Sequence, residues 1–270
     1  MNRDSRIHIA GDSTMIGKAL VRVLAKHGYR NIVGDRPDYV FVAAGKSGGI
    51  NANQKYPADF CADNLRVALD IIPASVGAKK LLYLGSSCIY PKHAPQPMSP
   101  ASLGTGLLEP ISAPYAAAKL AGIALCQGYR QQYGANFITA IPADVYGPGG
   151  KFSDEDSHVI PSMLAKLHAA KQRGLDHVTL WGTGTPRREF TYADDLAEAC
   201  LVAMDKYDGA DPINLGSGEV ASIKELAELA RATVGFAGEL RWDTSRPDGA
   251  PVKSLETSVL RSLEIGRAHV

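Results

Sequence analysis

The chain has 270 residues, a formal net charge of +1, and 21% charged and 45% hydrophobic residues. This length suits one large α/β unit, or a large domain with a smaller lobe. The near-neutral charge gives no reason to expect nucleic acid or an anionic membrane surface as a partner, and the hydrophobic runs are too short to span a bilayer.

The N-terminus and the cysteines indicate the compartment. Residues 1–6 lead directly into a short apolar run, without the long apolar core of a signal peptide. The four cysteines never form C-x-x-C, which favours reduced thiols. The histidines do not pair at metal-ligand spacing. We therefore expect a cytoplasmic protein with no metal site.

Apolar runs and amphipathic stretches alternate over the first 150 residues. The runs predict buried parallel strands at 7–10, 39–44, 80–85 and 137–141. The stretches predict helices at 16–26, 58–76 and 115–133. This alternation predicts an α/β fold with a doubly wound, Rossmann-like, mainly parallel sheet. Ligands of such sheets bind beyond the carboxyl ends of the strands, where the loops 11–17, 85–91 and 142–150 lie.

The second half of the chain predicts a smaller α+β substrate-binding lobe, with domains at 1–150 and 151–264. Helices are expected at 157–173, 193–204 and 222–234, and short strands at 178–181 and 213–215. Either strand could rejoin the main sheet. The last six residues, I-G-R-A-H-V, match a translated sequencing adapter, so we treat 265–270 as an artefactual tail and expect a truncated C-terminus.

One crossover of the sheet is unusually short. Only Y-R-N-I-V-G-D-R-P-D separates the first predicted helix from the strand at 39–44. A strand with its crossover helix needs more residues than this. Residues 31–33 could form a stub of that strand, with no room for its helix.

The loop G-D-S-T-M-I-G, residues 11–17, has the setting of a dinucleotide-binding turn. In that turn, glycines permit a tight bend and a close approach of the backbone to pyrophosphate. Gly11 and Gly17 supply the first and last glycines, while Thr14 replaces the middle one. An ordinary strand-to-helix turn is the alternative.

A second candidate site combines a residue at the end of a predicted strand with two residues at the start of a predicted helix. Ser86 follows the run at 80–85, and Tyr115 and Lys119 open the helix at 115–133. A Tyr and a Lys four residues apart share one helix face. An ammonium group beside the phenol is expected to lower the pKa of Tyr115, which suits a general acid. A surface Tyr–Lys pair is the alternative.

Several segments together resemble the GDP-L-fucose synthases, within the extended short-chain dehydrogenases/reductases. They span nearly the whole chain: A-A-G-K-S-G-G-I-N-A-N (43–53), Y-P-A-D-F (56–60), L-G-S-S-C-I-Y-P-K (84–92), P-Y-A-A-A-K-L-A-G (114–122), D-S-H-V-I-P (156–161), W-G-T-G-T-P-R-R-E-F (181–190) and R-P-D-G-A-P-V-K (246–253). The resemblance implies epimerisation and NADPH-dependent reduction of GDP-4-keto-6-deoxy-mannose by a homodimer.

The resemblance also assigns catalytic roles. Cys88 and His158 would exchange protons at the two carbons that flank the ketone. Tyr115, with Lys119 and Ser86, would stabilise the enolate oxygen and protonate it as hydride arrives at C4. A buried structural thiol and a helix cap are the alternatives for Cys88 and His158.

The NADPH contacts implied by the resemblance fall in four regions. They are Gly11, Asp12, Ser13, Thr14, Met15, Ile16 and Gly17; Asp35 and Arg36; Leu84, Gly85, Ser86 and Ser87; and Lys119, Pro142, Ala143, Asp144, Val145 and His158. The implied substrate contacts are Lys166, Trp181, Arg188, Asp248 and Lys253. Arg188 would grip the diphosphate with its planar fork of donors.

The chain departs from the family pattern in its cofactor region. Thr14 replaces a glycine, Ser13 replaces an arginine, and Asp144 replaces an asparagine in the P-x-N-x-Y-G-P loop. Two alternatives therefore stay open. One is another nucleotide-sugar epimerase, dehydratase or ketoreductase. The other is a truncated, non-catalytic nucleotide-sugar-binding homologue.

Overall fold

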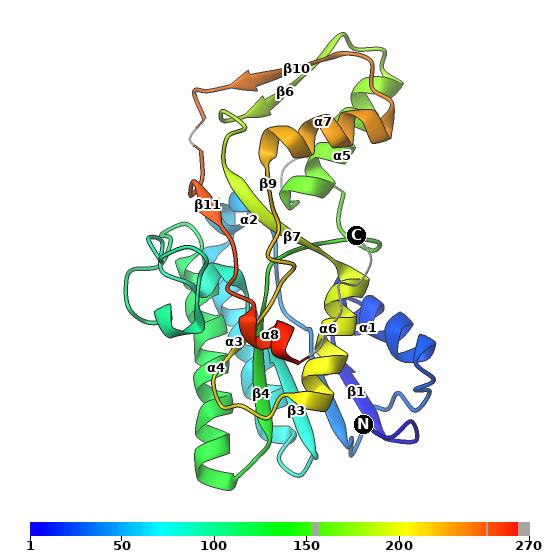
Figure 1. Cartoon of the computed structure of the whole chain (residues 1–270), viewed down its shortest axis with the longest axis vertical. Coiled ribbons are helices and arrows are strands. Elements are labelled where there is room, and N and C mark those ends of the chain that lie inside the picture. Colours follow the sequence, from blue (N-terminus) through cyan, green and yellow to red (C-terminus); the bar gives the residue numbers. More distant parts are fainter. Residues whose placement is uncertain (153–156, 247, 264–270) are drawn as a thin grey trace.

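A computed structural model describes residues 1–152, 157–246 and 248–263. Figure 1 shows a lower α/β layer structure and a smaller upper lobe. The predicted tail at 265–270 lies outside the described residues. In chain order the main elements up to residue 146 are β1 (Ile7–Ala10), α1 (Met15–Lys26), β2 (Tyr39–Val42), α2 (Ile50–Lys55), α3 (Pro57–Ala74), β3 (Lys80–Leu84), α4 (Ala113–Tyr133), β4 (Phe137–Pro142) and β5 (Asp144–Tyr146).

The remaining elements build the lobe and return to the sheet. They are α5 (Val159–Gln172), β6 (His177–Trp181), β7 (Arg187–Tyr192), α6 (Ala193–Lys206), β8 (Ile213–Leu215), β9 (Val220–Ser222), α7 (Ile223–Val234), β10 (Glu239–Asp243), β11 (Val252–Lys253) and α8 (Ser258–Ser262). Short 3₁₀ turns occupy Ser87–Ile89 and Pro100–Ser102.

The main sheet has five parallel strands in the order β1-β2-β3-β4-β8. Its strands are almost entirely buried, as the apolar runs predicted. The helices α1 and α6 pack on one face of the sheet, and α3 and α4 pack on the other. The doubly wound α/β prediction is confirmed. The strand predicted at 213–215 does rejoin the main sheet, as β8.

The short crossover has the predicted form. Ile32 makes an isolated parallel bridge with Ile7, and the amide of Val33 donates to the Ile7 carbonyl over 2.8 Å. No helix lies between this bridge and β2. The edge of the sheet beside β1 therefore carries a stub in place of a full strand and its helix.

The upper lobe has its own core. There β6 pairs with β10 in a separate two-stranded parallel sheet, so this strand does not rejoin the main sheet. α5 and α7 pack against it around Met163, Leu167 and Phe236. A further small sheet, β11-β7-β5 with β9 on β7, connects the lobe to the main sheet. This small sheet places β5 and β7 between the main sheet and the upper lobe.

Candidate active site

The loop 11–17 forms a closed turn between β1 and α1. Gly11 has φ +92°, and a Cβ there would lie 2.6 Å from the Ala44 backbone, so only glycine fits. The Thr14 hydroxyl donates to the Gly11 carbonyl over 2.7 Å and accepts from the Gly17 amide at 3.0 Å. Thr14 is thus the N-cap of α1. The residue that replaces the middle glycine closes the turn and leaves its bend intact.

Two further loops pack around this turn. The Thr14 hydroxyl also approaches the Ala43 carbonyl, at 3.3 Å, which ties the turn to the end of β2. A Cβ on Gly150 would lie 3.5 Å from the Met15 sulfur, so the loop after β5 lies against the first turn of α1. The predicted loops 11–17 and 142–150 therefore meet at the carboxyl edge of the sheet.

The end of β3 carries Ser86 and Cys88 to the start of α4. Ser86 is the N-cap of the 3₁₀ turn, and its hydroxyl accepts from the Cys88 amide at 3.3 Å. The same hydroxyl lies within hydrogen-bonding reach of the Tyr115 phenol, and the thiol of Cys88 interacts electrostatically with that phenol. The structure thus brings three of the five predicted catalytic residues, Ser86, Cys88 and Tyr115, into one cluster.

Lys119 lies one helical turn beyond Tyr115 and is only 6% exposed. Its ammonium donates to the Leu84 carbonyl over 3.1 Å, at the end of β3. Burial lowers the pKa of Lys119 from 10.5 to about 8. The amine therefore belongs to the same carboxyl edge of the sheet as Ser86.

The expected lowering of the pKa of Tyr115 is wrong. Burial raises the pKa of the phenol, and the nearby Cys88 and Asp144 raise it further, while Ser86 opposes the rise. Helical spacing put Lys119 on the correct face, but burial outweighs any effect of its ammonium. A phenol with a raised pKa keeps its proton at neutral pH, which suits a proton donor.

Phe60, which the sequence analysis gave no role, packs on the Tyr115 ring edge-to-face at a centroid distance of 6.1 Å. The ammonium of Lys46 lies 5.5 Å from the Phe60 ring and 3.0 Å from the Asp59 carboxylate. Phe60 belongs to the segment Y-P-A-D-F, so its signal was present in the resemblance. Its contact restricts the Tyr115 ring from the α3 side.

Arg188 extends from β7 towards the same cluster. It interacts electrostatically with Asp144, Cys88 and Asp248. Its guanidinium donates to the Ala250 carbonyl over 2.6 Å and to the Arg187 carbonyl over 2.8 Å. Burial lowers the pKa of Arg188, and the neighbouring acidic groups oppose that change. A partly desolvated guanidinium beside Cys88 is well placed to attract an anionic group.

His158 makes no hydrogen bond to this cluster among the described residues. It is exposed and is the N-cap residue of α5, directly after residues 153–156, which lie outside the described chain. Within the described residues it has no hydrogen bond or ion pair with Ser86, Cys88 or Tyr115. The structure therefore does not join the predicted second proton carrier to the first.

Three cationic or aromatic side chains gather at the lobe. Trp181 is 48% exposed, and the ammonium of Lys166 lies 5.4 Å from its ring. The guanidinium of Arg246 lies 4.8 Å from the same ring. Trp181 and Lys166 were predicted together, while Arg246 was missed although it begins the quoted segment R-P-D-G. An exposed indole flanked by cations suits a planar, anionic ligand.

The other predicted substrate residues lie on the connecting strands. The carboxylate of Asp248 accepts from the Thr183 amide at 2.9 Å and from its hydroxyl at 2.6 Å. These hydrogen bonds lower the pKa of Asp248. Lys253 is half-buried and pairs in register with Arg188 in the β11–β7 ladder. Asp248 and Lys253 thus both lie beside Arg188.

Asp35 and Arg36 lie on the edge loop that follows the stub strand. Arg6 donates to the Asp35 carbonyl over 2.7 Å. Arg36 has φ +42°, which is uncommon for a residue other than glycine. No contact among the described residues connects either side chain to the loop 11–17.

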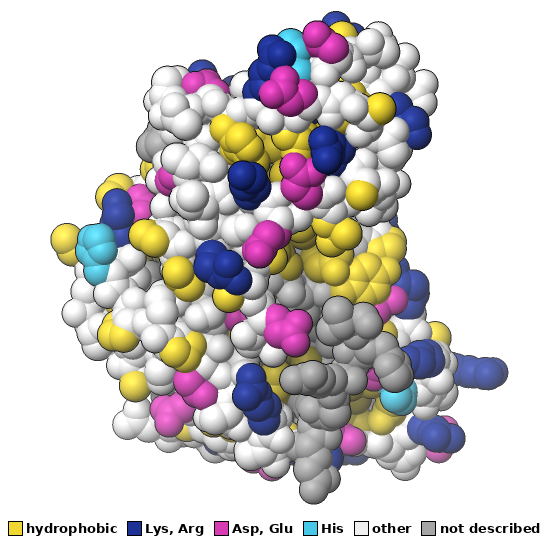
Figure 2. Space-filling view, turned by 45° about the horizontal axis from the view of Figure 1, so that its top comes forward, with side chains coloured by type: hydrophobic (Ala, Val, Ile, Leu, Met, Phe, Trp, Pro, Cys, Tyr) yellow, Lys and Arg dark blue, Asp and Glu magenta, His cyan; other side chains and the backbone are white. Residues whose placement is uncertain are grey.

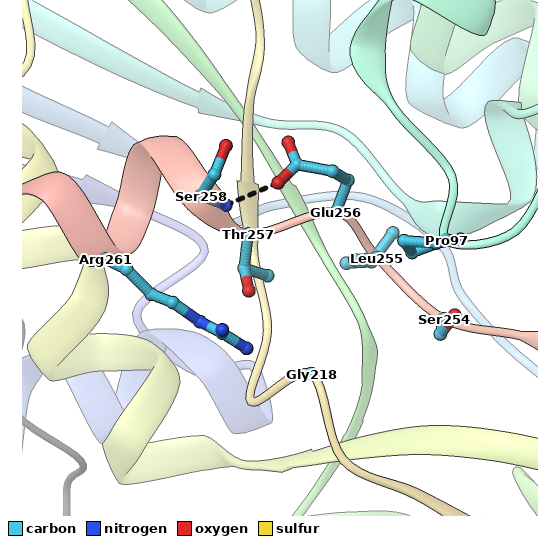
Figure 3. A pocket seen from close by; sticks show the side chains of 8 residues that line it. All are labelled: Pro97, Gly218, Ser254, Leu255, Glu256, Thr257, Ser258 and Arg261. Atoms are coloured by element: carbon cyan, nitrogen blue, oxygen red, sulfur yellow. Dashed lines mark hydrogen bonds between the residues drawn. The ribbon is translucent and has the colours of Figure 1, made fainter.

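A pocket of about 360 Å³ lies elsewhere, where α8 meets the loop after β8 (Figure 3). Residues 254–258, Pro97, Gly218 and Arg261 line it. None of the predicted site residues belongs to this lining. On the face shown in Figure 2, acidic and basic side chains are interspersed rather than gathered by sign.

Comparison with known proteins identifies the family. A family model described as "NAD dependent epimerase/dehydratase family" matches residues 30–216. The chain is 44% identical over 284 residues to GDP-L-fucose synthase 1 of Arabidopsis thaliana, covering 97% of this chain and 88% of that protein. The chain belongs to this epimerase/dehydratase family, among the GDP-L-fucose synthases. Its identity to the GDP-L-fucose synthase of Sinorhizobium fredii is 45%, over 96% of this chain and 89% of that protein.

Solved structures of reductases that act on GDP-linked sugars are also similar to the chain. A GDP-6-OMe-4-keto-L-xylo-heptose reductase from C. jejuni is 32% identical with a TM-score of 0.90, covering 97% of this chain and 93% of that one. A GDP-mannoheptose C4 reductase from Campylobacter jejuni with NADP bound is 34% identical with a TM-score of 0.86, over the same shares. No described helix is long and apolar enough to cross a membrane.

Proposed function

We propose that the chain binds NADPH and GDP-4-keto-6-deoxy-D-mannose and converts the sugar to GDP-L-fucose by epimerisation and reduction. The observation that carries this proposal is the cluster of Ser86, Cys88 and Tyr115 at the carboxyl edge of the sheet, with Arg188 beside it. Relatives named GDP-L-fucose synthase at 40–45% identity support the choice of substrate.

The residues present fit a dinucleotide at the loop 11–17. Gly11 leaves no side chain above the turn, and the first amides of a helix such as α1 have no acceptor within the helix, which suits an anionic group. When bound, NADPH would supply the hydride. Asp12, Ser13, Met15 and Ile16 complete this loop, and Ser87, Pro142, Ala143 and Val145 lie at the neighbouring strand ends. We propose that these residues hold the cofactor, with Asp35 and Arg36 facing its adenosine half.

In the proposed reaction Cys88 removes and returns a proton at a carbon beside the ketone. Ser86 and Tyr115 donate hydrogen bonds to the sugar oxygen, which stabilises the enolate that forms. The raised pKa of Tyr115 keeps the phenol protonated until that oxygen needs a proton. His158 would act at the second carbon, which requires that the start of α5 approach the cluster.

The nucleotide part of the substrate is assigned to the lobe. Arg188 would bind the diphosphate, with Lys166 and Lys253 adding positive charge. Trp181 offers an exposed ring on which a base can stack. Asp248 would act through its neighbour Arg188, since its carboxylate already accepts two hydrogen bonds from Thr183.

A second candidate function is plain reduction at C4 of a GDP-keto-sugar. The exposed position of His158 favours it, because a reductase needs no second proton carrier. Two structural relatives are named as reductases of GDP-linked sugars. Tyr115, Lys119 and Ser86 would have the same roles in both reactions.

Binding of NADPH tests the proposal first. Titration of the purified protein with NADPH is expected to show saturable binding, and the GDP-keto-sugar is then expected to accelerate NADPH oxidation. Tyr115→Phe should lower kcat by about 10²–10⁴-fold, the range for a lost general acid, with NADPH affinity unchanged. Binding of the GDP-sugar without any binding of NADPH at millimolar concentration would instead support the non-catalytic alternative.

The same proposal extends to assembly and compartment. We propose a cytoplasmic homodimer joined through the outer faces of α3 and α4, where Leu69 is 60% exposed and Tyr133 is 58% exposed. Large exposed apolar side chains on adjacent helices suit an interface between copies.

A further inference from the structure

One face of α4 carries four residues in helical register. Tyr115, Lys119, Gly122 and Cys126 follow the spacing i, i+4, i+7, i+11, and this face packs on β3. The side chain of Tyr83, on β3, points to the same side of the sheet as α3 and α4. Its ring therefore lies against the face of α4 that carries Tyr115 and Lys119.

The Tyr83 ring is completely buried, and the Lys119 ammonium lies 5.2 Å from its centroid. This contact is in the range of a cation–π interaction, which is strongest where water is excluded. The ammonium has one hydrogen-bond acceptor among the described residues, the Leu84 carbonyl. The aromatic face is a further group that can compensate its charge.

Gly122 makes this arrangement possible. A Cβ at residue 122 would lie 2.3 Å from the Tyr83 hydroxyl oxygen and 2.3 Å from its ring. Any larger residue would push the ring away from its present place. The Tyr83 hydroxyl itself has no hydrogen-bond partner although it is buried. The hydroxyl makes no hydrogen bond to Lys119, so the described contact between the two residues is the one with the ring.

Other groups around Lys119 do not offer a compensating negative charge. On its own helix the titratable neighbours are Tyr115 and the buried thiol of Cys126, and burial raises the pKa of both. From α3, the neutral amide oxygen of Asn64 lies behind Gly45, where it also lacks a partner. The Lys119 ammonium also lies beside Gly45, since a Cβ there would be 3.5 Å from it and 2.3 Å from the Asn64 oxygen. The π face of Tyr83 is the aromatic source of negative potential next to the ammonium, together with the neutral oxygens of Leu84 and Asn64.

We propose that Tyr83 is a positioning residue for Lys119, which its aromatic face holds charged and fixed beside Tyr115. The proposal rests on the proposed function only for the role of Lys119 in catalysis. The contact itself can be tested without cofactor or substrate, so its failure and the failure of the proposed function are distinguishable.

The test is a pH titration of the Lys119 ammonium by NMR, in protein with ¹³C-labelled lysine and no cofactor. The signal is assigned by its loss in Lys119→Met. Tyr83→Phe keeps the ring and should titrate as wild type does. Tyr83→Leu removes the ring and should titrate at lower pH, because burial then acts without the aromatic face.

An unchanged midpoint in folded Tyr83→Leu would overturn the proposal, as would equal shifts in Tyr83→Leu and Tyr83→Phe. If Tyr83→Leu does not fold, Tyr83→Met gives the same comparison, since its unbranched side chain adapts to irregular space. The pH profile of NADPH oxidation provides a second readout. Because reduction needs the charged amine in this proposal, the alkaline limb of that profile should move to lower pH in Tyr83→Leu or Tyr83→Met and stay in place in Tyr83→Phe.

Discussion

Removal of the buried amine should stabilise the protein while it abolishes reduction. The pKa of Lys119 falls from 10.5 to about 8 on folding. Each unit corresponds to about 1.4 kcal/mol, so a charged Lys119 at pH 7 costs the folded state on the order of 3 kcal/mol. Lys119→Met removes this cost but also removes a donor from the Leu84 carbonyl, a loss of about 1 kcal/mol. It removes the contact with the Tyr83 ring as well, a further loss of about 1 kcal/mol. We expect a net gain of about 1 kcal/mol, or about 2–4 °C in Tm.

The pH dependence of stability separates this cause from improved packing. The unfolded amine keeps its proton up to about pH 10.5, whereas the folded amine loses it near pH 8. The unfolded state binds more protons between these values, so Lys119 makes wild-type stability rise across that window. Lys119→Met should lack this rise. The assay is urea unfolding of the cofactor-free protein from pH 7 to pH 10.5.

Lys80 provides the matched control. It is also buried, but its ammonium lies 2.9 Å from the Asp208 carboxylate. Lys80→Met removes a paired charge and should lower stability. A lower Tm for Lys119→Met, or a rise in its stability between pH 8 and 10.5 as large as in wild type, would refute the reasoning.

Three other predictions follow from the same geometry. Gly11→Ala should weaken NADPH binding in a titration, because φ at this position is +92° and the added Cβ would overlap the Ala44 backbone. Gly34→Ala should leave NADPH binding unchanged, because its added Cβ would have no other atom within 4 Å. Arg188→Lys should raise KM for the GDP-sugar about tenfold or more with little change in the KM for NADPH, because the ammonium lacks the planar fork; equal changes in both KM values would contradict the assignment. Leu69→Asp should convert the proposed dimer to a monomer in size-exclusion chromatography, whereas an unchanged elution volume would place any interface elsewhere.

The main sheet was predictable because its strands are buried on both faces and therefore appear as apolar runs. β7 was not predicted: its sequence R-R-E-F-T-Y carries three charged residues, and its strand form comes from pairing with β5, β9 and β11. α2 was also missed, because six residues after two glycines give too short a pattern to detect.

The site was predictable where it depends on local spacing, and less so where it depends on burial. The four-residue spacing of Tyr115 and Lys119 gave the correct helix face. It could not predict whether the pKa of Tyr115 is raised or lowered, because that depends on how completely the surrounding elements bury the phenol. Likewise, no local pattern places His158 relative to Cys88, since the two residues belong to different parts of the fold.

The most direct test of the account is the reaction in D₂O with NADPH and GDP-4-keto-6-deoxy-mannose. The account predicts stoichiometric NADPH oxidation and GDP-L-fucose that carries deuterium at both C3 and C5, the carbons that exchange protons with protein side chains. Cys88→Ala should leave NADPH binding intact and remove deuterium from one of these carbons. NADPH oxidation by the wild type without deuterium at either carbon would contradict the account and identify a plain C4 reductase.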